Sequence, residues 1–88
     1  MPWDIKWSKT AENQLRKIFR LNKNIAQQIV TKLEEISDNP YLFTEKLRGV
    51  NLRKLRIGNY QVILYLEEQK LIIFVVQVGP RSNIYGKL

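Results

Sequence analysis

The sequence predicts an α+β domain, in which a helical hairpin packs on a twisted, mainly antiparallel sheet in the order β-α-α-β-β-β. Two observations lead to this prediction. Residues 8–36 place apolar side chains at helical spacing, whereas residues 52–78 contain apolar runs separated by short turn sequences. The chain has 88 residues, of which 44% are hydrophobic, and this is enough for one modest core. We therefore expect a single domain over residues 1–88.

The N-terminal half predicts one strand and two amphipathic helices. Alternating Trp3, Ile5 and Trp7 are typical of a half-buried strand, and Ser8 then offers a helix N-cap. Asn24 is expected to cap the second helix, with Gln27 in the capping-box position. The residues expected to face the core in the two helices are Ala11, Leu15, Ile18, Phe19, Ile25, Ala26, Ile29, Val30, Leu33 and Ile36.

The C-terminal half predicts a connector and three strands. The connector spans residues 41–51, and we expect Leu42, Phe43 and Leu47 to pack onto the core. Strands follow at residues 52–57, 60–65 and 71–78. Gly58 and Asn59 form the first hairpin turn, in which Gly supplies a positive φ. The last strand is apolar on both faces in its first part, so it should lie inside the sheet under the helices.

The composition excludes several kinds of chemistry. The chain has no His and no Cys, and its acidic residues form no cluster, so we expect no metal and no cofactor. Any catalysis must then use Lys, Arg, Tyr or carboxylates. No run of 18 apolar residues and no signal-peptide pattern is present, which predicts a cytoplasmic protein without a membrane partner.

Positive charge is concentrated in the second half of the chain. The net charge is +7; residues 1–45 carry seven Lys/Arg against six Asp/Glu, whereas residues 46–88 carry eight against two. Five cations occur within eleven residues with no acid between them: Lys46, Arg48, Arg53, Lys54 and Arg56. This pattern favours a polyanionic partner such as nucleic acid. The alternative is a solvated rim that only aids solubility.

Strand periodicity separates these cations. Leu55 and Ile57 share one face, so Lys54 and Arg56 share the other, about 7 Å apart. That distance is close to the spacing of successive phosphates, so both side chains could hold one backbone. Arg53 has the parity of the buried face but lies at the start of the strand, where it can turn outward.

Two further candidates follow the last strand. Arg81 comes directly after Gly79 and Pro80, and its planar guanidinium suits a two-point contact with phosphate. The alternative is a salt bridge, although acids are scarce in this half. Tyr85 could stack on a base, or it could be a packing residue near the C-terminus.

Several segments together resemble the RelE/ParE superfamily of toxins. They are residues 47–49, residues 53–63, residues 76–81 and Tyr85. In the RelE branch, the resemblance implies a ribosome-dependent endoribonuclease, or mRNA interferase, that inhibits translation and is neutralised by a cognate antitoxin. The RNA 2′-hydroxyl attacks the adjacent phosphate and leaves a 2′,3′-cyclic phosphate and a 5′-hydroxyl. Such enzymes use Lys, Arg and Tyr in place of His, which suits this chain.

The resemblance also implies roles for particular residues. Those expected to be catalytic are Lys54, Arg56, Arg81 and Tyr85, and those expected to contact RNA are Lys46, Arg48, Arg53 and Gln61. One position departs from the superfamily pattern, because Gln61 stands where an Arg is typical. A neutral amide cannot neutralise an oxyanion, and loss of one such contributor costs about 100- to 1000-fold in rate. Either Arg56 or Arg53 substitutes for it, or the nuclease is weak.

Two other functions remain open from the sequence. One is a ParE-like inhibitor of DNA gyrase without nuclease activity, and the other is a weakened toxin homologue that acts mainly in an antitoxin complex. The resemblance implies a RelB-like antitoxin as partner in each case. Ribosome and mRNA are the further partners of a nuclease, and operator DNA is expected only through the antitoxin complex.

Overall fold

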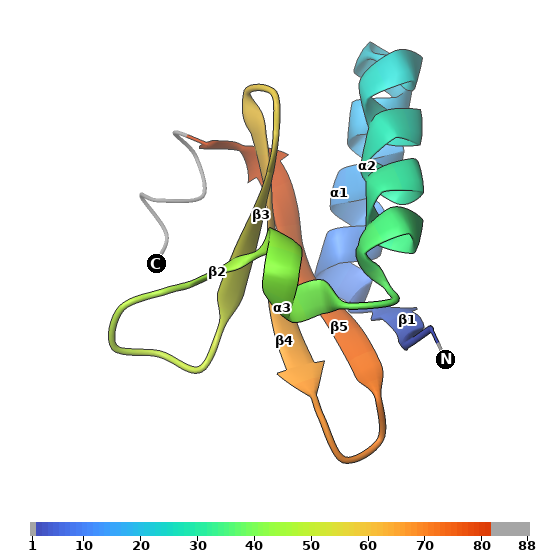
Figure 1. Ribbon diagram of the computed structural model, residues 1–88. Coiled ribbons are helices and arrows are strands. Elements are labelled where there is room, and N and C mark those ends of the chain that lie inside the picture. Colours follow the sequence, from blue (N-terminus) through green and yellow to red (C-terminus); the bar gives the residue numbers. More distant parts are fainter. Residues whose placement is uncertain (1, 82–88) are drawn as a thin grey trace.

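The computed structural model describes residues 2–81 and is an α+β fold, as predicted (Figure 1). Its elements are β1 (Asp4–Trp7), α1 (Lys9–Leu21), α2 (Lys23–Ile36), α3 (Pro40–Phe43), β2 (Glu45–Lys46), β3 (Arg53–Ile57), β4 (Tyr60–Glu67) and β5 (Ile72–Pro80). The described strands form one sheet in the order β1-β5-β4-β3-β2. β1 pairs with β5 in parallel, and the other pairs are antiparallel. Figure 1 shows α1 and α2 side by side on one side of this sheet.

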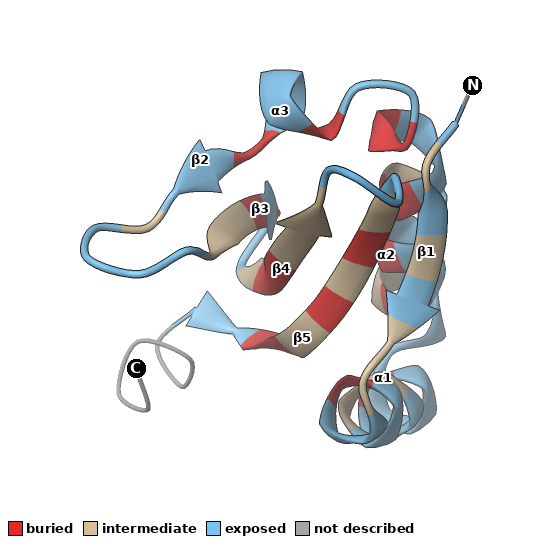
Figure 2. Cartoon of the chain, turned by 90° about the horizontal axis from the view of Figure 1, so that it is seen from below, coloured by how far each residue is buried: buried red, intermediate tan, exposed pale blue. Residues whose placement is uncertain are grey.

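The core lies between the helical hairpin and the sheet. Its fully buried side chains include Ile29, Leu33, Ile36, Val62, Leu64, Ile73, Val75 and Val78 (Figure 2). Trp3, Ile5, Trp7, Leu15 and Ile25 pack against this cluster while remaining partly exposed. β5 lies inside the sheet between β1 and β4, which confirms its predicted position.

Two predicted core residues are instead exposed. Phe19 is 48% exposed and Val30 is 37% exposed. Together with Leu15 and Ala26 they line a shallow apolar groove of about 390 Å³ between α1 and α2. Helical spacing identified the apolar side of each helix correctly. The prediction was wrong because the apolar stripes are wider than the strip that the sheet covers.

The helix caps confirm one prediction and correct another. Ser8 caps α1 by accepting the Ala11 N–H at 3.0 Å, as expected, and its hydroxyl also donates to the Val76 carbonyl at 3.0 Å. The cap of α2 is Asn22 rather than Asn24, because the Asn22 side chain accepts the Ile25 N–H at 3.2 Å. A single residue therefore ends α1 and starts α2, and the joint is tighter than the predicted three-residue break.

The connector contains two short elements that the sequence did not predict, α3 and β2. Pro40 occupies the first turn of α3, where its missing N–H leaves no helical hydrogen bond unmade. Leu42 is 72% exposed and Phe43 is 53% exposed, so the expectation that they pack onto the core is wrong. Leu47 is half-buried.

The β3–β4 hairpin forms at the predicted turn. Gly58 has a φ of +59°, a value that L-residues rarely adopt, so the glycine is required by the backbone conformation. This turn sets the register of the hairpin, in which Arg56 lies opposite Gln61 and Lys54 lies opposite Ile63. No helix within residues 2–81 is long and apolar enough to cross a membrane.

Candidate functional site

The face of the sheet opposite α1 and α2, here called the outer face, carries the predicted basic residues of β3. Leu55 and Ile57 are buried in the core, so the alternating Lys54 and Arg56 lie on the outer face. Residues directly opposite in neighbouring strands share a face. The register therefore adds further residues to the outer face: Ile63 and Gln77 in the row of Lys54, and Gln61 and Gly79 in the row of Arg56.

Lys54 and Arg56 differ in their exposure. The Lys54 side chain is only 14% exposed, and its Nζ lies 3.6 Å from a carboxylate oxygen of Glu45 in β2. Glu45 itself is 70% exposed, so solvent screens this ion pair. Arg56 is exposed. The pair thus combines a cation held close to the sheet with one that extends into solvent. Glu45 was missed by the sequence reasoning.

Arg81 lies at the end of β5, next to the β3–β4 turn. Its backbone N–H donates to the Asn59 carbonyl at 3.1 Å, which joins the strand end to the turn. Arg81 is exposed and comes two residues after Gly79, which is in register with Gln61 and Arg56. The fold therefore brings Arg81 to the same end of the sheet as Arg56. Tyr85 lies outside the described residues.

Two glutamine side chains in the outer face have buried amide atoms without hydrogen-bond partners. Gln61 is 0% exposed, and neither Nε2 nor Oε1 of its amide has a partner. The Oε1 atom of Gln77 is also buried and unpaired. A buried polar atom without a partner costs about 1–3 kcal/mol, which is a large amount for a small domain. Gln77 was missed by the sequence reasoning, although a single polar residue within the apolar run of β5 was a signal of a functional position.

Arg53 lies at the start of β3, where it could turn outward, but its guanidinium instead contacts Thr44 and Tyr41. Its Nε donates to the Thr44 hydroxyl at 2.7 Å, and its second terminal nitrogen donates to the Thr44 carbonyl at 2.8 Å. The guanidinium also lies over the Tyr41 ring, 5.2 Å from its centre. Burial, together with the nearby Glu68 carboxylate, raises the pKa of Tyr41. Arg53 therefore fastens α3 to the start of β3, and we leave it out of the RNA surface proposed below.

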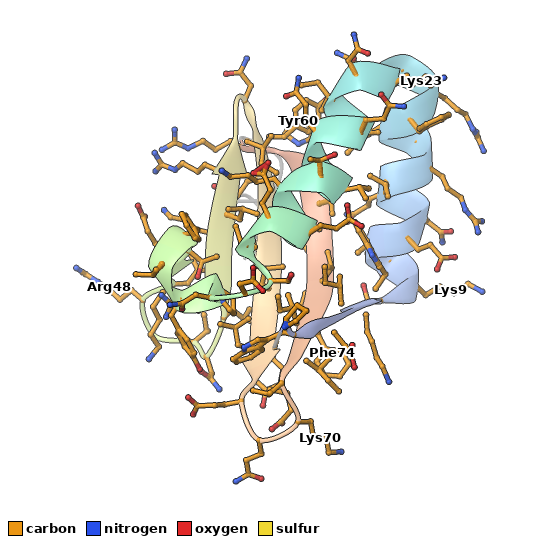
Figure 3. The ribbon with its side chains drawn as sticks, turned by 45° about the vertical axis from the view of Figure 1, so that its right-hand side comes forward. Lys9, Lys23, Arg48, Tyr60, Lys70 and Phe74 are labelled. Atoms are coloured by element: carbon orange, nitrogen blue, oxygen red, sulfur yellow. The ribbon has the colours of Figure 1, made fainter. Side chains whose placement is uncertain are left out.

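The other predicted RNA contacts lie away from Lys54. Lys46 is exposed in β2 and lies opposite Arg53, so it has the parity of the other face of the sheet. Arg48 is exposed in the loop after β2 and points away from the body of the protein (Figure 3). Lys46 and Arg48 therefore form a basic flank beside the outer face and do not belong to its central rows. Tyr60, which the sequence left ambiguous, packs against the core (Figure 3).

Residues 2–81 contain no group of three or more metal-ligating side chains. The outer face carries cations, the neutral amides of Gln61 and Gln77, and the fully buried apolar side chain of Ile63. Such a surface can bind a phosphodiester through Lys54, Arg56 and Arg81. It can also hydrogen-bond a neutral polar group through Gln61 and Gln77.

Known proteins match this chain over nearly its whole length. Residues 5–85 match the family described as the ParE toxin of type II toxin–antitoxin system, parDE. A protein of Escherichia coli described as RelE-like toxin is 37% identical over 83 residues, covering 89% of this chain and 87% of its own length. The mRNA interferase toxin RelE of Escherichia coli K12 is 30% identical over 81 residues, covering 86% of this chain and 85% of its own length.

Solved structures share the fold. A mutant of the Escherichia coli toxin RelE in the free state has a TM-score of 0.80 at 25% identity, covering 98% of this chain and 93% of that chain. The toxin–antitoxin complex RelBE2 from Mycobacterium tuberculosis has a TM-score of 0.82 at 20% identity, covering 92% of this chain and 100% of that chain. This chain therefore belongs to the ParE toxin family of type II toxin–antitoxin systems, within the RelE/ParE superfamily.

Proposed function

We propose that this toxin is a ribosome-dependent endoribonuclease that cleaves mRNA and thereby inhibits translation. The observation that supports this function best is the clustering of three cations at one end of the sheet. Lys54 and Arg56 share the outer face, and Arg81 ends the strand that is in register with Gln61. The similarity to mRNA interferase RelE favours RNA as the polyanion that these cations bind.

The proposed reaction is a transesterification within the RNA. Lys54 acts in its neutral amine form: it accepts the proton of the 2′-hydroxyl, and the 2′-oxygen then forms a bond to the adjacent phosphorus. The bond from phosphorus to the 5′-oxygen breaks, and the leaving oxygen takes a proton from water, which gives a 2′,3′-cyclic phosphate and a 5′-hydroxyl. Arg81 and Arg56 stabilise the negative charge that develops on the phosphate oxygens. Tyr85 positions the reacting nucleotide.

The two basic residues of the connector region extend the binding surface. Lys46 and Arg48 are exposed beside the outer face, so they can contact the RNA backbone further along the strand. Such contacts add affinity without base preference, and this affinity falls as the salt concentration rises. The ribosome holds the mRNA in place, which supplies much of the positioning that an 88-residue protein cannot.

Gln61 contributes hydrogen bonds but no charge. Arg56 is the partner of Gln61 in the strand register, so its guanidinium can supply the charge that the neutral amide does not. Arg53 is committed to Thr44 and is a poor substitute. We therefore expect a weaker nuclease than one with an arginine at position 61, by up to about 100- to 1000-fold.

A cognate antitoxin of the RelB kind is the proposed partner. Several of the similar structures are RelB–RelE complexes, including one from Methanococcus jannaschii. An acidic segment of the antitoxin would neutralise the toxin by covering the cations of the outer face. Operator DNA would be bound through the antitoxin in this complex.

A second candidate function is inhibition of DNA gyrase, which the match to the ParE toxin family favours. The two functions are separated by one pair of assays on purified protein. Primer extension on mRNA bound to ribosomes reports new 5′ ends, and supercoiling by gyrase reports the alternative. The nuclease function predicts new 5′ ends with wild type, none with Arg81→Ala, and normal gyrase activity with both. Gyrase inhibition without mRNA cleavage would instead establish the second function.

A further inference from the structure

We propose that Gln61 and Gln77 form a base-recognition site. The two amides would bind the edge of an RNA base next to the scissile phosphate and would prefer a base with an exocyclic amino group over uracil. This inference rests on the proposed nuclease function, because it names the part of the substrate that the same outer face recognises. Gln61 would then determine base specificity, in addition to lacking the positive charge of the arginine that is typical at this position.

The register brings the two glutamines together. Gln61 lies opposite Gly79 and Gln77 lies opposite Ile63, so the glutamines are diagonal neighbours on β4 and β5. Diagonal neighbours have Cα atoms about 7–8 Å apart, which long side chains can bridge. Yet the structure pairs neither amide atom of Gln61, and it leaves the Gln77 oxygen unpaired too. These three buried atoms are the hydrogen-bonding groups of the proposed site.

The hydrogen-bond donors and acceptors among the unpaired atoms determine which base fits the site. Gln61 Nε2 carries two N–H donors, whereas Gln61 Oε1 and Gln77 Oε1 are acceptors. Adenine, cytosine and guanine each offer an exocyclic amino group with two N–H donors next to a ring or carbonyl acceptor. Uracil offers one N–H on its pairing edge, so it would leave one glutamine oxygen buried without a partner. A site with a buried polar atom left unpaired discriminates strongly against such a ligand.

The position of the amides suits a base of the reacting RNA. Arg56 lies directly opposite Gln61, and Lys54 is in the row of Ile63 and Gln77. A phosphate held by the two cations would therefore place its neighbouring base over the amides and the apolar Ile63. Gln61 is covered in the free protein, so side chains on this face must move as the base enters. Arg56 is exposed, and exposed side chains change rotamer on the picosecond to nanosecond timescale.

The test is cleavage mapping on ribosome-bound mRNAs that carry each of the four bases at the positions flanking the cut. We expect wild type to cut less beside uracil at one flanking position. Gln61→Met should raise the relative cleavage beside uracil by about 5- to 150-fold, which corresponds to the discrimination of one bidentate contact. Gln77→Met should raise it by a smaller factor. Gln69→Met, in the exposed loop after β4, should match wild type.

A second measurement does not depend on activity. Met is apolar and similar in volume, so Gln61→Met removes two unpaired amide atoms and should raise the Tm of the free protein. A lower Tm for both Gln61→Met and Gln77→Met would overturn the proposal, because it would show that the amides are paired within the fold. If Gln61→Met stops cleavage, Gln77→Met tests the proposal instead: raised relative cleavage beside uracil supports it, and the wild-type base preference overturns it.

The outcomes separate this inference from the function on which it rests. If wild type cuts no ribosome-bound mRNA, the nuclease function fails and the base site with it. If the two glutamine variants cut with wild-type base frequencies, the base site alone fails. If they keep those frequencies but bind the antitoxin more weakly, the amides bind the protein partner and the proposal is overturned.

Discussion

Arg53 and Arg56 lie three residues apart on one strand, and replacing each with Ala should have opposite consequences. Arg53 makes two hydrogen bonds shorter than 3 Å to Thr44 and lies over the Tyr41 ring. Thr44 is 7% exposed, so solvent cannot fully replace these contacts. Arg56 is exposed on the outer face, where its charge serves RNA binding.

The size of the Arg53 effect follows from its contacts. Each hydrogen bond to the buried Thr44 is worth about 1–1.5 kcal/mol, the upper part of the range for ordinary hydrogen bonds, and the contact with the ring adds about 0.5–1 kcal/mol. The sum is about 3 kcal/mol. A domain of this size loses about 5 °C in Tm per kcal/mol, so Arg53→Ala should lower the Tm by about 15 °C.

Arg56→Ala should change the free energy of unfolding by less than about 0.5 kcal/mol, since it removes an exposed side chain. Its cleavage of ribosome-bound mRNA should nevertheless fall by about 100-fold, the low end for one charged contributor to the transition state. Thermal unfolding followed by circular dichroism and primer extension give the two readouts. The reasoning would be refuted if Arg53→Ala melted like wild type, or if Arg56→Ala lowered the Tm as much as Arg53→Ala.

Substitutions at four further positions test three local features. Asn22→Ala should destabilise the protein by about 1 kcal/mol by removing the cap of α2, whereas Asn24→Ala should change stability little; urea unfolding that shows the reverse would restore Asn24 as the cap. Gly58→Ala should cost about 1 kcal/mol from backbone strain alone, because a Cβ at this position would meet no atom within 4 Å. Gly58→Asn should cost less, and equal losses in Tm for the two variants would argue against strain. Glu45→Gln should leave the free energy of unfolding within about 0.5 kcal/mol of wild type, since the ion pair with Lys54 is screened. It should also strengthen binding to single-stranded RNA at low salt, and unchanged affinity in a filter-binding titration would contradict that expectation.

Much of the fold could be predicted because periodicity reports directly on which side of an element is buried. The alternation of Leu55 and Ile57 with Lys54 and Arg56 placed both cations on the outer face, and the register confirms it. Periodicity does not report how wide the covering layer is. Phe19 is exposed for this reason, since the sheet covers only part of the apolar side of α1.

Other features depended on contacts between distant segments, which no local pattern encodes. From the sequence Arg53 could turn outward, but Thr44 offers two oxygen acceptors once α3 forms. α3 itself is a single turn, which is too short to give a periodic signal. Gln77 belongs to the candidate site only because the β4–β5 register makes it a diagonal neighbour of Gln61.

The most direct test of the proposed nuclease function is mRNA cleavage in a purified translation system, with wild type and Arg81→Ala compared at equal ribosome occupancy. Arg81 is exposed, so its loss should leave the fold intact while removing charge stabilisation at the phosphate. Wild type should produce new 5′-hydroxyl ends that depend on ribosomes, and Arg81→Ala should produce at least about 100-fold fewer. Equal cleavage by the two proteins, or no cleavage by wild type while it binds ribosomes, would contradict the proposed function.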